Sequence, residues 1–152
     1  MDTKIFVNLP VKDLGVTMEF FGKLGFEFNP QFTNENAACM VVSQDIYVML
    51  LVESFFQTFT KKELADATKV TEVITALSVE SREAADELLA LALEAGAEEA
   101  REVQDLGFMY SRSFSDPNGH IWEVFWMDEA AAAEEAKKNA PEEAGFESPV
   151  VE

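Results

Sequence analysis

Alternating apolar residues open the chain and then give way to a helical spacing. The stretch 4–11 favours a strand. Asp13 occupies the position of a helix N-cap, apolar residues recur at helical spacing over 14–24, and Gly25 stands where such a helix would stop. Three strand-like runs separated by short polar turns follow, over 26–32, 37–43 and 46–52. The first half therefore predicts the order β-α-β-β-β.

The second half of the chain repeats this order. The pattern predicts a strand over 73–79, a helix capped by Ser81 and ended by Gly96, and then three more strands. These strands cover 98–103, 108–115 and 120–127, and a DPNG turn joins the last two. The motif LPV in the first half corresponds to LSV in the second, as a weak internal repeat would give. We predict an α+β fold of two paired β-α-β-β-β modules.

The segment 54–69 joins the two halves and contains three phenylalanines. It is too apolar for a free linker, so we expect it to pack across a groove or against a partner subunit; a substrate lid is the alternative. We predict a single domain over 1–127 with modules at about 1–53 and 70–127. An acidic, Ala/Glu-rich tail over 128–152 should lie on the surface.

Composition narrows the possible partners and compartments. The 152 residues carry a formal charge of −18, which argues against nucleic-acid binding. No apolar run approaches the roughly 18 residues of a membrane-spanning helix, and the N-terminal residues enter a strand pattern without a secretory signal. We therefore expect a cytoplasmic protein without membrane contact. The single cysteine, Cys39, has apolar neighbours and should be a buried thiol.

Two motifs suggest a family. The doubled module, with NLPVKDL at 8–14 and SDPNGHIWEVFW at 115–126, resembles the vicinal oxygen chelate superfamily. That group includes glyoxalases, extradiol dioxygenases, fosfomycin-resistance enzymes and metal-free bleomycin-resistance proteins. The resemblance spans about 4–127 and implies two curved sheets that form a barrel-like cavity, with helices outside and a small-molecule site within.

The resemblance also implies where a metal would be bound, near the first and last strand of each half. These positions hold Phe6, about Leu50, Ile74 and Glu123, of which only Glu123 is a metal-ligating residue. A catalytic divalent metal usually has at least three protein ligands, so we expect neither a metal nor another cofactor there. Strand alternation turns His120 to the face opposite Glu123, which favours a turn-capping or surface role over a ligand role.

The same alternation predicts the lining of the cavity. If Glu123 faces inward, Trp122, Val124 and Trp126 point to the helices. A buried carboxylate without a metal must be protonated or paired, and an inward Arg112 would be one partner for it or for an anionic ligand. The orientation of the strand 108–115 stays open. The candidate ligand-binding residues are Phe6, Asn8, Ala76, Tyr110, Arg112 and Phe125.

Two functional classes follow from this lining. We expect a homodimeric binder of a small, largely apolar or aromatic molecule, with any cationic group of that molecule met by Glu123. The alternative is a lyase- or isomerase-type enzyme similar to lactoylglutathione lyase, with Glu123 as general acid or base. An extradiol dioxygenase would require a bound metal. A third possibility is that Glu123 is a structural remnant and the Phe-rich segment serves dimerisation.

Overall fold

The computed structural model describes residues 2–139 and contains two four-stranded sheets, one from each half of the chain. The first sheet has the order β1-β4-β3-β2 and the second β5-β8-β7-β6, with the first and last strand of each module parallel. The first module comprises β1 (Ile5–Val11), α1 (Leu14–Lys23), β2 (Glu27–Phe28), β3 (Ala37–Val41) and β4 (Ile46–Val52). The second comprises β5 (Ile74–Ser78), α3 (Arg82–Glu94), β6 (Glu98–Asp105), β7 (Met109–Ser115) and β8 (Ile121–Met127). The predicted fold class is confirmed.

Local signals in the sequence set most element boundaries. The carboxylate of Asp13 accepts a hydrogen bond from the Val16 amide, and the Ser81 hydroxyl accepts one from the Ala84 amide, so both predicted N-caps are confirmed. The predicted strand over 26–32 is wrong beyond Phe28. A short 3₁₀-helix, η1 (Pro30–Phe32), replaces it because Pro30 has no N–H to pair in a sheet and the Asn29 side chain caps the turn.

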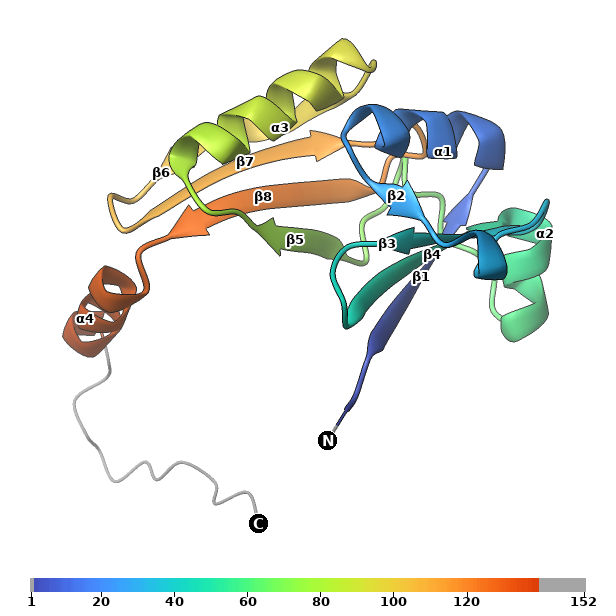
Figure 1. The fold of residues 1–152 in the computed structure, drawn as a ribbon, viewed down its shortest axis with the longest axis horizontal. Coiled ribbons are helices and arrows are strands. Elements are labelled where there is room, and N and C mark those ends of the chain that lie inside the picture. The colour runs from blue at the N-terminus through green and yellow to red at the C-terminus, as the bar shows by residue number, and fades with distance from the viewer. Residues whose placement is uncertain (1, 140–152) are drawn as a thin grey trace.

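A shared core joins the two modules. Helices α1 and α3 lie on the same side of the two sheets (Figure 1). From α1, Phe21 contacts Trp122 of β8 at 4.9 Å between ring centroids, and Phe20 contacts Phe114 of β7 at 5.9 Å. All four side chains are buried. Trp122 is therefore a core residue, as alternation along its strand predicted.

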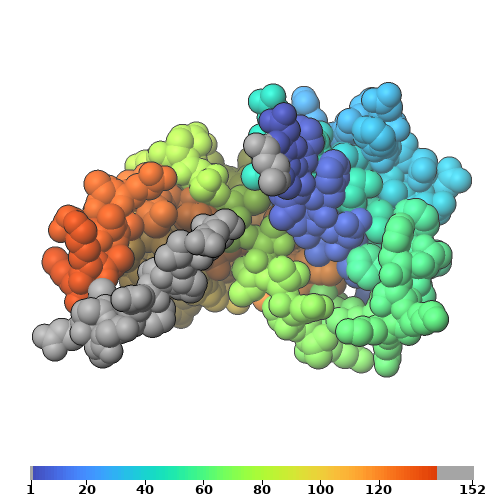
Figure 2. Space-filling view, turned by 90° about the horizontal axis from the view of Figure 1, so that it is seen from below, coloured from blue at the N-terminus to red at the C-terminus, as the bar shows by residue number. Residues whose placement is uncertain are grey.

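The opposite side of each sheet, which Figure 2 views, is not covered by these helices. Large apolar side chains remain exposed on it: 49% of Phe6 on β1 and 51% of Ile74 on β5 are accessible. We call these two surfaces the open faces of the first and second sheet.

The segment between the modules packs against the first strand. It contains α2 (Glu53–Phe56) and the 3₁₀-helix η2 (Gln57–Phe59) and then continues without regular structure to β5. In Figure 2 this segment, in green, borders the blue N-terminal strand. Gly119 of the DPNG turn lies against its backbone: a Cβ built on Gly119 would stand 2.8 Å from Ala67 and Thr68 atoms. The segment thus packs against the DPNG turn of its own chain, while a groove, a partner subunit and a lid all stay open as its role.

The acidic tail begins with a helix, α4 (Glu129–Asn139), which extends beyond the end of β8 (Figure 1). It has no buried residue, in agreement with the predicted surface position. The rest of the predicted tail, 140–152, lies outside the described residues. None of the helices within residues 2–139 is long and apolar enough to cross a membrane.

Candidate functional site

Glu123 lies on the open face of the second sheet and has lost most of its contact with water. Its side chain is 17% exposed. The Ser111 hydroxyl donates a hydrogen bond to Oε1 at 3.1 Å, and Nη2 of Arg101 lies 3.2 Å from Oε2. Both carboxylate oxygens are therefore engaged. The sequence required a protonated or paired carboxylate, and the structure shows a paired one.

Strand register places the partners of Glu123 on the same face. Glu123 is aligned with Ser113 of β7 and with Ala76 of β5, and Ser113 is aligned in turn with Arg101 of β6. Paired residues of neighbouring strands point to the same side of a sheet. The Ser113 hydroxyl oxygen is buried here and has no hydrogen-bond partner among residues 2–139. The open face of the second sheet therefore carries a polar centre.

Arg101 is the exposed member of this centre. Its Nη2 atom contacts Gln104 Oε1 at 3.1 Å and Ser111 Oγ at 3.3 Å in addition to Glu123. Within the described part of the chain, its Nε and Nη1 atoms have no hydrogen-bond partner, and the side chain is 46% exposed. We call Arg101, Ser111 and Glu123 the polar anchor. It leaves N–H donors of a guanidinium available to a ligand.

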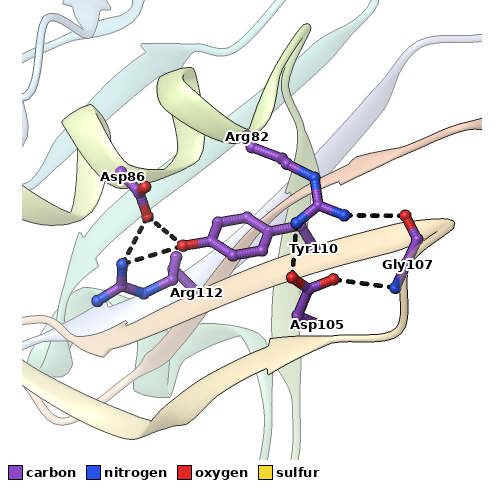
Figure 3. Close-up of polar contacts among 6 residues, drawn as sticks. All are labelled: Arg82, Asp86, Asp105, Gly107, Tyr110 and Arg112. Carbon is purple, nitrogen blue, oxygen red and sulfur yellow. Dashed lines mark hydrogen bonds and ion pairs between the residues drawn. The ribbon is translucent and has the colours of Figure 1, made fainter.

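Tyr110 and Arg112 lie on the other side of the second sheet, toward α3 (Figure 3). The Tyr110 hydroxyl donates to the Asp86 carboxylate at 2.6 Å, and Arg112 binds Asp86 and, at 3.0 Å, Glu99. The hydrogen bond to Asp86, together with burial, raises the pKa of Tyr110. The orientation of this strand, which the sequence left open, is thereby settled: β7 turns its serines, not Arg112, to Glu123, so the candidate ligand residues Tyr110 and Arg112 lie away from it.

A second arginine holds this helix-side network together. Arg82 at the start of α3 lies 5.1 Å from the centre of the Tyr110 ring and binds the Asp105 carboxylate at 2.7 Å and the Gly107 carbonyl at 2.9 Å (Figure 3). Its hydrogen bond to Asp105 raises the pKa of the Arg82 guanidinium. These contacts connect α3 to β6 and β7, which makes the network a structural one.

The remaining predicted residues lie on the two open faces. On the first sheet, Phe6 stacks on Tyr47 with 4.8 Å between centroids and 11° between planes, and the Asn8 amide donates to the Phe6 carbonyl at 3.1 Å. On the second sheet, Ala76 and Phe125 share the face of Glu123. Phe6 and Asn8 therefore belong to a different sheet from the polar anchor, and the two sheets share no strand pairing within residues 2–139.

The side chains at the implied metal positions do not fit a metal ion. Phe6 and Ile74 carry no donor atom, Leu50 is turned into the core with 0% exposure, and both oxygens of Glu123 are already bound. In the described range 2–139, no three His, Cys, Asp or Glu side chains are grouped so that they could hold a metal. Structural metal sites need such a group.

The DPNG motif and His120 connect the second module to the first. The carboxylate of Asp116 accepts hydrogen bonds from the Asn118 and His120 amides and from Trp122 Nε1, and burial raises its pKa. The Asn118 side chain binds the Thr17 hydroxyl of α1 at 3.1 Å, and His120 Nε2 lies 2.7 Å from the Pro10 carbonyl oxygen. The motif therefore has a structural role, and His120 is not aimed at Glu123.

A cavity of about 620 Å³ lies away from the polar anchor, and the sequence did not predict it. Its walls are Val7–Pro10 of β1, the segment after α2, and Gly119–Ile121 at the start of β8. Asn8 is the one predicted ligand-binding residue that lines it. The phenylalanines of the joining segment were a sign of a packed surface, but the cavity depends on the path of the irregular chain after η2.

Comparisons with known proteins agree with this fold. Residues 3–43 match the family model described as bleomycin resistance protein-like N-terminal. The hypothetical protein SA1046 from S. aureus is 27% identical, with a TM-score of 0.70 over 83% of this chain and 95% of that one. A glyoxalase-related enzyme from Fulvimarina pelagi is 18% identical, with a TM-score of 0.69 over 83% of this chain and 88% of that one.

A fosfomycin resistance protein from Listeria monocytogenes, solved with Mn(II) and sulfate, is 17% identical, with a TM-score of 0.60 over 82% of this chain and 89% of that one. No curated protein matches the chain. The N-terminal match and these structural likenesses show that the chain has the fold of the glyoxalase/bleomycin resistance/dioxygenase group. Within that group a shared fold does not define a reaction.

Proposed function

We propose that the protein binds a small, largely apolar or aromatic molecule on the open face of the second sheet without turning it over. The observation that carries this proposal is the state of Glu123, whose two carboxylate oxygens are taken by Ser111 and Arg101. A metal ion on Glu123 would stand beside another cation, the Arg101 guanidinium, and the described residues offer no group of three carboxylate, histidine or cysteine side chains to hold it. In this arrangement Glu123 orients Arg101 instead.

The free donors of Arg101 define the polar end of the ligand. A cationic group at Glu123 would have to displace Arg101, whereas a carboxylate or other acceptor can bind Nε or Nη1 while the ion pair stays intact. The neighbouring Ile121, Phe125 and Ala76 supply apolar contact on the same face. A hydrogen bond to a charged group contributes about 1.5–3 kcal/mol, which corresponds to roughly a 10- to 150-fold change in affinity.

We also propose a homodimer in which a second copy covers the open faces. Phe6 and Ile74 are each about half exposed, at 49% and 51%. Exposed apolar surface of this kind marks an interaction site, and a ligand site closed from one side only would leave much of an apolar ligand in water. Light scattering of Phe6→Asp and Ile74→Asp proteins should show monomers, with the wild-type chain as a dimer.

The binding experiment compares probes that share one apolar body. Isothermal titration of the full chain with 4-phenylbutyrate, 4-phenylbutanol and 4-phenylbutylamine tests the polar end of the ligand. We expect Arg101→Met to lower the affinity for 4-phenylbutyrate at least tenfold, since the substitution removes the hydrogen-bond donors and keeps the apolar stem. Arg112→Met, on the far side of the sheet, is the matched control. An equal loss of affinity for 4-phenylbutyrate in both variants, or no loss in Arg101→Met, would contradict the proposal.

Assays for lactoylglutathione formation and catechol cleavage address the enzymatic alternatives. We expect no turnover by the wild-type protein in either assay, with or without added Mn(II), Zn(II), Ni(II) or Fe(II). Turnover that Glu123→Gln abolishes would show that the binder proposal is wrong and would restore a catalytic role for Glu123.

A further inference from the structure

The cavity beside β1 has the dimensions of an independent ligand site. Its volume of about 620 Å³ is within the range of about 300–1,000 Å³ that is usual for small-molecule pockets. We call it the linker pocket, because residues 60–73, between η2 and β5, form its roof. No member of the polar anchor lines it, so a ligand here would not touch Glu123 or Arg101.

The pocket has an apolar interior and a charged rim. Phe56 and Leu64, both half-buried, line the pocket, and the core residue Leu9 forms part of its wall. Glu63, Glu72 and Lys62 are exposed and stand at the rim. Neither carboxylate forms an ion pair within residues 2–139. The rim therefore has an excess of negative charge.

The roof of the pocket is held in place by several independent contacts. The Asp66 carboxylate accepts hydrogen bonds from the amide and hydroxyl of Thr68, at 3.0 and 2.7 Å, and lies 3.8 Å from the Lys12 ammonium. The amide of Gln57 binds the carbonyls of Thr60 and Lys62, both at 2.9 Å. These contacts, with the close approach of Gly119, hold the backbone of the roof, and a preformed pocket loses less entropy on binding.

We propose that the linker pocket binds an amphipathic amine, with the apolar body inside and the ammonium group at Glu63 and Glu72. An exposed ion pair is worth about 0.2–1 kcal/mol, so two carboxylates against one lysine give a modest preference for a cation. The charge of −18 on the whole chain acts in the same direction by raising the local concentration of cations and lowering that of anions. The proposal is independent of the ligand at the polar anchor.

The same probe series tests this site on the full chain. We expect 4-phenylbutylamine to bind to the full chain. Val70→Trp, which fills the pocket from an exposed position, should lower the affinity for this amine at least tenfold. Val16→Trp on α1 is the matched control, because Val16 and Val70 are similarly exposed, at 51% and 55%. Thr71→Tyr fills the pocket from a second exposed position and should give the same result if Val70→Trp does not fold.

A charge variant tests the rim separately from the volume. The double variant Glu63→Gln, Glu72→Gln should lower the affinity for 4-phenylbutylamine about fivefold and leave the affinity for 4-phenylbutanol unchanged. The control double variant Glu87→Gln, Glu94→Gln on α3 should change neither affinity. Arg101→Met should not affect the amine, which separates this site from the polar anchor. Amine binding that survives both pocket-filling variants, or an equal loss in the two double variants, would overturn the proposal.

Discussion

The ion pair between Arg101 and Glu123 can be measured by a double-mutant cycle. The side chains of Arg101 and Glu123 are 46% and 17% exposed. The energy of this ion pair should therefore lie between that of a surface pair, about 0.2–1 kcal/mol, and that of a buried pair, in which loss of one partner costs about 3–5 kcal/mol. We expect Arg101→Met and Glu123→Gln to show a coupling energy of about 1–2 kcal/mol in urea unfolding at fixed protein concentration. Each single variant should lower Tm by about 2–4 °C per kcal/mol lost.

A control cycle with Arg112→Met tests the orientation of β7. Arg112 and Glu123 lie on opposite sides of the second sheet, so the effects of substituting them on the free energy of unfolding should add to within about 0.5 kcal/mol. Arg112→Met alone should still be destabilising, because it removes the partner of Asp86 and Glu99. Additive effects for Arg101 with Glu123, together with coupled effects for Arg112 with Glu123, would refute the assigned geometry.

Three further predictions concern the fold that carries the sites. Gly119→Ala should lower the free energy of unfolding by about 2–4 kcal/mol, because φ is +90° and the new Cβ would meet the backbone of the joining segment. Gly22→Ala, with open space around it on α1, should raise it by about 0.5–1 kcal/mol. Chemical unfolding of the two variants makes the comparison. Trp122→Phe should cost about 2–4 kcal/mol in the same assay, since it leaves a cavity and removes the donor to Asp116. Cys39 is 1% exposed and burial raises its pKa, so a thiol reagent should label it only at the rate of unfolding; fast labelling of the native protein would contradict its burial.

The predictable part of the fold depends on local signals. Asp13 and Ser81 mark helix starts by their own side-chain hydrogen bonds, and alternation along β8 separates Glu123 from Trp122 without any knowledge of the neighbouring strands. The predicted strand over 26–32 is wrong at Pro30, where the missing N–H and the Asn29 cap favour a 3₁₀ turn.

The partner of Glu123 was beyond prediction from local pattern. Arg101 reaches it from a strand whose pairing with β7 shifts register between Glu99 and Arg101 and again between Arg101 and Gln104. Such bulges break the alternation by which faces are assigned from sequence. Arg112, one partner that the sequence left open, stands on the regular strand β7 and faces α3. The sequence could therefore predict that the carboxylate is paired or protonated, but not which arginine pairs with it.

The linker pocket was not predictable for a different reason. Its roof is irregular chain that is positioned by the contact of Gly119 with Ala67 and by the ion pair of Lys12 with Asp66. Residues far apart in the sequence make both contacts. Hydrophobic periodicity carries no information on the path of such a segment.

A crystal structure of the full chain, grown with excess Mn(II) and Zn(II), is the most direct test of the claim that Glu123 orients an arginine and does not ligate a metal. We predict Arg101 Nη2 and Ser111 Oγ within hydrogen-bond distance of the two carboxylate oxygens and no metal on either. A cation bound by Glu123 and at least two other side chains, with Arg101 displaced, would contradict it.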